Sequence, residues 1–305
     1  MTRHTLAIDS SVCTGSIQSV SDGRLWRSVA AAALACAVAW TAAVLFLWVA
    51  QSWLLFRVGE SRAATAALDR RVFTQSSFVT ANGLRLESVL LTHDPAEERY
   101  WILFCPPAGA STRVARIQGH LQQLWRFGYN VFAFDYRGFG GNRGTPSEDG
   151  LYEDATAAYR SLIDGHGVAP TRVVIAGRSL GASVAVDLAT RVESGGLLLF
   201  SPIDSVPAAA ARIYPWAPVR WLARYRFDNS SKAAIVGQPV VLVYGAPDPY
   251  MPLADARSLF QAFRGRRTML ETNGNHHHSG FMELGTLQDA LEKVWPVPPI
   301  QEPSQ

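Results

Sequence analysis

A serine flanked by two glycines follows a short apolar run. Gly177, Ser179 and Gly181 come directly after the apolar, mostly β-branched run 173–176, and an Ala- and Val-rich segment of helical character follows them. Gly-x-Ser-x-Gly in this context is typical of a tight strand-to-helix turn that exposes a nucleophilic serine, because only small residues fit two positions before and after it. Without that context the motif indicates only a glycine-rich turn. Ser179 is therefore the candidate nucleophile, and the N–H of Leu180, at the start of the helix, is a candidate oxyanion donor.

Two further residues complete a possible proton-transfer set. Asp248 stands four residues after the apolar run 240–244, where the other role of an aspartate in a Pro-rich turn is local capping. His276 follows the next predicted strand and is the first of three consecutive histidines. A histidine there can take the serine proton while a carboxylate fixes its tautomer, and the three residues stand in a chain order known for such triads. Position in the turn favours His276 as the base, with His277 and His278 as alternatives.

The second oxyanion donor is expected in the loop that follows the apolar run 101–105. Pro106 and Pro107 begin this loop and have no N–H to donate. Ala108 is therefore the candidate donor, and Gly109 allows the backbone to bend close to a substrate.

No metal and no cofactor are expected. Consecutive histidine side chains point in different directions, and no second ligand cluster with suitable spacing accompanies them. The three cysteines, Cys13, Cys36 and Cys105, are scattered and odd in number, so they indicate neither a disulfide framework nor a metal site.

The elements that must position these residues alternate along the chain. Amphipathic stretches of helical length separate most of the apolar runs, which lie at 101–105, 131–134, 173–176, 197–200, 240–244 and 268–271. This alternation predicts an α/β fold with a mostly parallel sheet and helices on both faces. Ligand sites in such sheets lie beyond the carboxyl ends of the strands, where the candidate residues stand. Before the parallel strands, 78–92 predicts a hairpin with Asn82-Gly83 as a two-residue turn.

The chain is expected to divide into a polar segment (1–27), a transmembrane anchor (28–56), a linker (57–74), a catalytic domain (75–295) and a flexible tail (296–305). Between positions 29 and 50 the only clearly polar residue is Thr41. An apolar run of this length can cross the ~30 Å hydrocarbon layer, and Trp26, Trp48 and Trp53 suit its interfaces. A cleaved signal peptide is the alternative, but the preceding polar region and the run itself are both longer than usual.

Charge excludes one class of partner and only weakly indicates an orientation. The net charge is +3 and the arginines are dispersed, so nucleic-acid binding is not expected. Two arginines flank the apolar run on one side and four on the other, which slightly favours a cytoplasmic catalytic domain.

Four stretches resemble one known family: Asp-Tyr-Arg-Gly-Phe-Gly-Gly at 135–141 within a similar region ending at Asp154, Gly-Arg-Ser-Leu-Gly-Ala at 177–182, Tyr-Pro-Trp-Ala-Pro-Val-Arg-Trp at 214–221, and Arg-Phe-Asp at 226–228. They resemble the membrane-anchored, ABHD-type branch of the α/β-hydrolase superfamily, the serine hydrolases of the bud-emergence-protein type. The resemblance implies an α/β-hydrolase fold after one transmembrane helix, a triad of Ser179, Asp248 and His276, and structural roles for 135–138 and Asp154. It also implies that a bacterial member is held in the inner membrane with its catalytic domain in the periplasm, which is the orientation we expect.

Two departures from the family pattern bear on activity. Pro106-Pro107 stands where the family usually has His-Gly, and Asn-Gly-Asn-His276 stands where Gly-x-Gly-His is common. We expect a serine hydrolase of carboxylic esters or thioesters, acting on a small-molecule, lipid or acylated-protein ester at the bilayer. A peptidase and a catalytically weak membrane-tethered interaction module are the alternatives. The segment 201–238 is expected to form either a small lid or short helices on the sheet edge, and the sequence indicates no oligomeric state.

Overall fold

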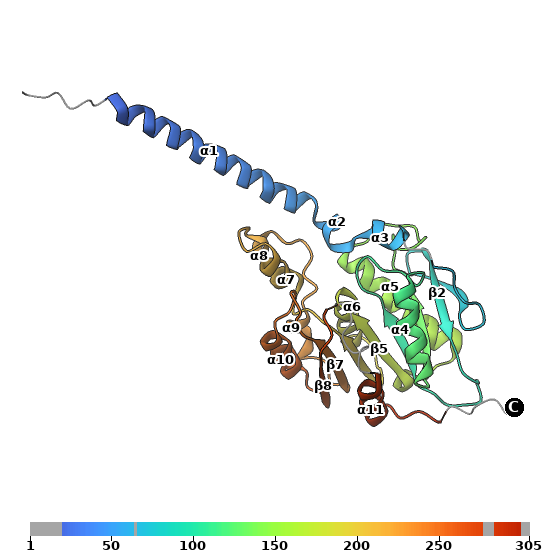
Figure 1. The fold of residues 1–305 in the computed structure, drawn as a ribbon. Helices are drawn as coiled ribbons and strands as arrows, with labels where there is room; N and C mark the ends of the chain where they lie inside the picture. The colour runs from blue at the N-terminus through green and yellow to red at the C-terminus, as the bar shows by residue number, and fades with distance from the viewer. Residues whose placement is uncertain (1–19, 64–65, 277–283, 300–305) are drawn as a thin grey trace, which may run out of the picture. The chain divides into compact units, whose positions relative to one another are not determined.

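The computed structural model describes residues 20–63, 66–276 and 284–299. By its internal contacts the chain divides into two compact units, residues 1–47 and 48–305. Helix α1 (Val20–Val49) makes up the described part of the first unit and runs into the second (Figure 1). In the described part of the chain, one helix is long and apolar enough to cross a membrane, the 26 residues Arg24–Val49, and none of its most apolar stretch is buried.

An eight-stranded sheet forms the centre of the second unit, in the order β1-β2-β4-β3-β5-β6-β7-β8. Strands β1 and β2 pair antiparallel, as do β2 and β4, and every later pairing is parallel. The strands are β1 (Thr74–Val79), β2 (Arg85–Leu91), β3 (Trp101–Cys105), β4 (Asn130–Phe134), β5 (Val173–Arg178), β6 (Gly196–Phe200), β7 (Val240–Gly245) and β8 (Arg267–Thr272). The predicted mostly parallel sheet is confirmed.

Helices cover both faces of the sheet because side chains alternate along each strand. On β3, Leu103 packs into a core shared with α5 and α6, whereas Ile102 packs into a second core shared with α4 and α11. The strands β3 to β7 are buried on both sides, which explains their continuous apolar sequences. The covering helices are α4 (Ala115–Arg126), α5 (Glu148–Arg160), α6 (Leu180–Ala189), α10 (Leu253–Ala262) and α11 (Leu284–Val294).

The predicted hairpin is present, but its predicted two-residue turn is wrong. Val79 pairs with Arg85, and the Thr80 N–H donates to the carbonyl of Leu84, so three residues form the loop. Gly83 lies there at φ 82°, a left-handed conformation that glycine adopts without strain.

Two segments outside the sheet matter for the site. After α1, the short helices α2 (Gln51–Phe56) and α3 (Val58–Ala63) follow, the second within the segment predicted as a linker. Between β6 and β7 lie α7 (Val206–Ile213), α8 (Val219–Leu222) and α9 (Asn229–Ala233) (Figure 1). The chain after α11 is held by Arg99, whose side chain donates to the carbonyl oxygens of Pro298 and Pro299, at 3.0 and 3.3 Å.

Candidate active site

Ser179 lies on the turn between β5 and α6, in a backbone conformation that most residues avoid. Its φ and ψ are 52° and −119°, which costs conformational energy in a non-glycine residue. The two flanking glycines are required by close backbone approach. A Cβ on Gly177 would clash with the carbonyl of Gly181, and a Cβ on Gly181 would clash with the carbonyl of Cys105. The turn therefore holds the serine outward and packs directly against the end of β3.

His276 joins the serine to a buried carboxylate. Its Nε2 lies 2.9 Å from Ser179 Oγ, and its Nδ1 lies 2.6 Å from Asp248 Oδ2. The other oxygen of Asp248 accepts the N–H groups of Tyr250 and Met251, at 2.8 and 3.1 Å. Three side chains from the ends of β5, β7 and β8 are thus brought together in the order serine, histidine, aspartate. The alternatives His277 and His278 lie outside the described residues.

The two backbone N–H groups predicted as oxyanion donors lie in the turn after Ser179 and in the loop after β3. Leu180 is the first residue of α6, so its N–H has no acceptor within the helix. Ala108 lies in the loop after β3, and within the described chain its N–H donates to no backbone oxygen. Gly181 approaches the carbonyls of Cys105 and Pro106 closely, so the turn and the loop are in contact. Both donors belong to the same small region beside Ser179.

The loop that contains Ala108 is held by residues outside the loop. The Gly109 N–H donates to the carbonyl oxygen of Phe56, at the end of α2, over 3.0 Å. At the far end of the loop, the Thr112 N–H donates to Asp135 Oδ1 over 2.6 Å. Burial raises the pKa of Asp135 to about 7, against the lowering effect of its bonds to Thr112.

Comparisons with known proteins place the chain in a family. The chain is 31% identical over 256 residues to the uncharacterized protein Rv2307c of Mycobacterium tuberculosis, a match that covers 82% of this chain and 89% of that protein. It is 33% identical over 136 residues to the human alpha/beta hydrolase domain-containing protein 17B, covering 45% of this chain and 46% of that protein. A family model described as serine aminopeptidase, S33, matches residues 102–233.

Solved structures share the fold at lower identity. An alpha-beta hydrolase from Vibrio vulnificus superposes with a TM-score of 0.66 at 19% identity, covering 80% of this chain and 92% of that one. The Pyrococcus furiosus esterase Pf2001 gives a TM-score of 0.64 at 16% identity, covering 76% and 94%. The chain belongs to the α/β-hydrolase superfamily, in its ABHD-type group. The fold expected from the sequence is confirmed.

In this α/β-hydrolase, Asp154 ties the turn after β4 to helix α5. It accepts the Arg137 backbone N–H at 2.8 Å and the Arg137 guanidinium at 2.8 and 2.9 Å, and it is fully buried. Asn142 completes the turn by donating to the carbonyl of Asp135 at 2.6 Å.

Arg178 has a role that the sequence analysis missed. It precedes the nucleophile and is 2% exposed, and its Nη2 donates to the carbonyl of His276 over 3.1 Å. Burial lowers the pKa of Arg178 to about 10, with Arg116 adding to the effect. Its side chain links the turn of the nucleophile to the loop of the base. A long basic residue inside Gly-x-Ser-x-Gly was the only sequence signal for this contact.

Two other kinds of chemistry, a reactive cysteine and a metal site, can be compared with the triad among the described residues. Cys105 is fully buried at the end of β3, and burial raises the pKa of its thiol to about 12. Thiolates, not thiols, are the reactive form, so this cysteine is inert near neutral pH. Within the described residues, no group of three or more His, Cys, Asp or Glu side chains is placed to hold a metal ion.

Proposed function

We propose that the protein is a membrane-anchored serine hydrolase that cleaves carboxylic esters or thioesters. The observation that supports it is the continuous pair of hydrogen bonds from Ser179 Oγ to His276 and from His276 to Asp248, at 2.9 and 2.6 Å. Such a relay lets the imidazole accept the serine proton while the carboxylate stabilises the imidazolium.

The proposed reaction has two acyl-transfer steps. Ser179 Oγ attacks the carbonyl carbon and passes its proton to His276, and the carbonyl oxygen becomes an oxyanion that accepts from the N–H groups of Leu180 and Ala108. The C–O or C–S bond then breaks, and His276 returns the proton to the leaving alcohol or thiol. Water, deprotonated by His276, attacks the acyl-serine in the same way. The products are a carboxylic acid and the free enzyme, and no cofactor is needed.

The membrane part of the proposal rests on α1. The predominantly apolar span Arg24–Val49 has 26 residues and measures about 39 Å at about 1.5 Å per residue, which exceeds the ~30 Å hydrocarbon thickness. Its side chains are exposed, whereas an apolar helix of a soluble core would be buried. We place the catalytic domain in the periplasm of a bacterial inner membrane. Tethering at a bilayer favours a lipid, an acylated protein or another apolar ester as substrate.

A fluorophosphonate probe, which phosphonylates activated serines, tests the proposal. The full chain in detergent or vesicles is labelled as wild type, Ser179→Ala, His276→Ala and His277→Ala. We expect no labelling of Ser179→Ala, labelling slowed by at least about 100-fold in His276→Ala, and near-normal labelling in His277→Ala. Slowed labelling in His277→Ala alone would assign the base to the neighbouring residue, and a folded wild type that resists the probe would overturn the proposal.

A peptidase is the second candidate, favoured by the description of the family model that matches residues 102–233. Matched ester, thioester and anilide substrates with the same acyl group separate the two. Turnover of the ester at least about 100-fold above that of the anilide supports the first assignment, whereas comparable rates support a peptidase. An interaction module without catalysis would turn over none of them.

A further inference from the structure

The segment that follows β6 exposes large apolar side chains beside charged ones. Trp221, at the end of α8, is 86% exposed, and Ile213, at the end of α7, is 46% exposed. Trp53, in the separate helix α2, is 72% exposed. Isolated exposed apolar residues are ordinary, whereas exposed apolar side chains that gather in one patch mark a binding surface.

The two regions that carry these tryptophans are joined. The side chain of Gln51, at the start of α2, donates to the carbonyl of Leu222 over 3.0 Å and accepts the Arg224 N–H over 2.8 Å. Ser52 Oγ lies 2.7 Å from the hydroxyl of Tyr225. Trp53 follows Ser52 in the chain and Trp221 precedes Leu222, so each tryptophan is next to a residue of this contact. The contact itself begins two residues after the apolar helix α1.

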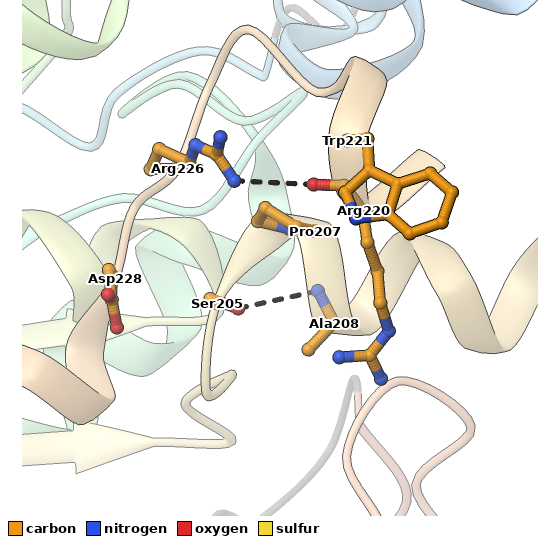
Figure 2. A pocket seen from close by; sticks show the side chains of 7 residues that line it. All are labelled: Ser205, Pro207, Ala208, Arg220, Trp221, Arg226 and Asp228. Atoms are coloured by element: carbon orange, nitrogen blue, oxygen red, sulfur yellow. Dashed lines mark hydrogen bonds between the residues drawn. The ribbon is translucent and has the colours of Figure 1, made fainter. Parts of the chain in front are cut away.

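Three of the chain's arginines lie in the same short stretch. Arg220, Arg224 and Arg226 occur within seven residues, with no acidic residue between them. The guanidinium of Arg224 lies 4.1 Å from the ring centre of Trp48. Arg220, Trp221 and Arg226 also line a hollow of about 280 Å³ with Ser205 and Asp228 (Figure 2).

We infer that Trp53, Trp221 and the three arginines form a second membrane contact, which binds a phospholipid bilayer with anionic headgroups. This inference rests on the proposed anchoring by α1. Tryptophan is enriched at membrane–water interfaces, where its ring is apolar and its N–H meets water. Arginines close to such a surface attract anionic headgroups, and Arg220 and Arg226 both line the hollow in Figure 2.

Chain continuity favours a bilayer over a protein partner. Trp48 is the second-to-last residue of the potential membrane span, and Gln51 lies two residues beyond its end at Val49. A bilayer that holds α1 therefore lies next to this surface. The α7–α8 segment also begins close to the active site. It follows β6, whose last residue, Phe200, accepts the Ser179 N–H over 3.0 Å. The contact would therefore present bilayer-embedded esters to the nucleophile.

Depth-dependent quenching of tryptophan fluorescence tests the contact. The full-length wild type, Trp221→Phe and Trp125→Phe are reconstituted in vesicles of phosphatidylcholine and phosphatidylglycerol with brominated acyl chains. Trp125, on α4, is half-buried and is stacked on His93. We expect Trp221→Phe to lose a clear part of the quenchable emission, and Trp125→Phe to lose emission that bromine does not quench. An unchanged quenchable fraction in Trp221→Phe would overturn the inference.

Two isoleucines give a matched pair for function. Ile213 lies on α7, whereas Ile235, which is 67% exposed, lies beyond α9. We expect Ile213→Glu to slow hydrolysis of a vesicle-embedded ester by about 5-fold or more with a soluble short-chain ester unaffected, and Ile235→Glu to change neither. Equal slowing of both esters, or an equal effect at both positions, would contradict the inference.

The anionic component has its own measurement. Replacing Arg220 and Arg226 together by Gln should reduce quenching in vesicles that contain phosphatidylglycerol and leave it unchanged in pure phosphatidylcholine. No difference between the two lipids would refute the headgroup assignment, and quenching that depends on protein concentration would indicate a second copy of the chain instead. Failure of the proposed function is separable, because quenching needs no turnover and fluorophosphonate labelling needs no vesicle contact.

Discussion

The triad side chains and the oxyanion loop lie next to each other but are held in different ways. Ser179, Asp248 and His276 stand at the ends of parallel strands of one sheet, and they bond to each other and to their own turns. The loop 106–111 begins with two prolines and is held at Gly109 by Phe56 and beyond its far end by Asp135. The triad therefore depends on the sheet, whereas the loop depends also on helix α2, which lies outside the sheet.

This difference separates the proton-transfer parts of the site from the part that stabilises charge. Phe56 is fully buried, and its ring packs edge-on against Tyr225 at 5.0 Å and Phe227 at 6.4 Å. The residue that positions the loop thus also contacts the segment after α8. A disturbance of α2 should alter oxyanion stabilisation and leave the triad intact.

Removing the nucleophile should have the largest effect and should not depend on the loop. We expect Ser179→Ala to lower ester turnover by at least about 1,000-fold, with substrate binding retained. A stability close to wild type is expected, since the new residue occupies the same left-handed backbone. The measurement is the initial rate on a short-chain ester, with Ser77→Ala on β1 as the control. Residual turnover above one per cent would mean that another residue acts as nucleophile.

Gly181→Ala should break the contact between the two regions. A Cβ at this position clashes with the carbonyls of Cys105 and Pro106, so the turn and the loop must separate. We expect a loss of about 100-fold in kcat, the effect of a lost oxyanion donor, measured by burst kinetics on soluble, folded protein.

Gly119→Ala is the matched control, because a Cβ there meets no atom within 4 Å and lies in helix α4. It should keep full activity and gain up to about 1 kcal/mol of stability. Equal behaviour of the two variants would show that the close approach at Gly181 is unimportant.

Phe56→Ala should weaken the loop without touching the triad. The lost ring costs about 3–5 kcal/mol of unfolding free energy, and Phe78→Ala, in the same core, should cost a similar amount. We expect only Phe56→Ala to lower kcat in the folded fraction, by about 10-fold, because its carbonyl positions Gly109. Denaturant titration with parallel rate measurements separates stability from activity. Equal kcat losses in the two variants would count against a positioning role.

Asp135→Asn should have the smallest effect on activity and a clear effect on pH dependence. Asn keeps an oxygen that accepts the Thr112 N–H. Burial raises the folded pKa of Asp135 to about 7, above the unfolded value of about 3.9. Between pH ~4 and pH ~7 the Asp135 carboxyl is protonated in the folded protein and ionised in the unfolded chain. The free energy of unfolding therefore falls as the pH rises through this range, by at most ~4 kcal/mol.

The substitution removes that contribution, so the difference in unfolding free energy between pH 5 and pH 8 should shrink. Urea titrations at the two pH values provide the measurement. An unchanged difference would show that Asp135 is already ionised in the folded protein.

Local sequence was enough to predict the sheet and the three residues that the structure brings together. Continuous apolar strands, the Gly-x-Ser-x-Gly turn and polar residues after strands all depend on neighbours within a few positions. The hairpin turn was misjudged because Asn-Gly is compatible with loops of two or three residues, and strand pairing decides between them.

By itself, the sequence determined the alternating α/β architecture, the apolar helix Arg24–Val49, and the positions of Ser179, Asp248 and His276 after their strands. The tertiary structure decided which distant segments support the site: Phe56 bonds to Gly109, 53 positions apart, and Arg178 bonds to His276, 98 apart. Backbone carbonyls are present at every residue, so no residue type marks the one that accepts a bond from a distant loop. That choice arises only when the packed core brings the two segments within hydrogen-bonding distance.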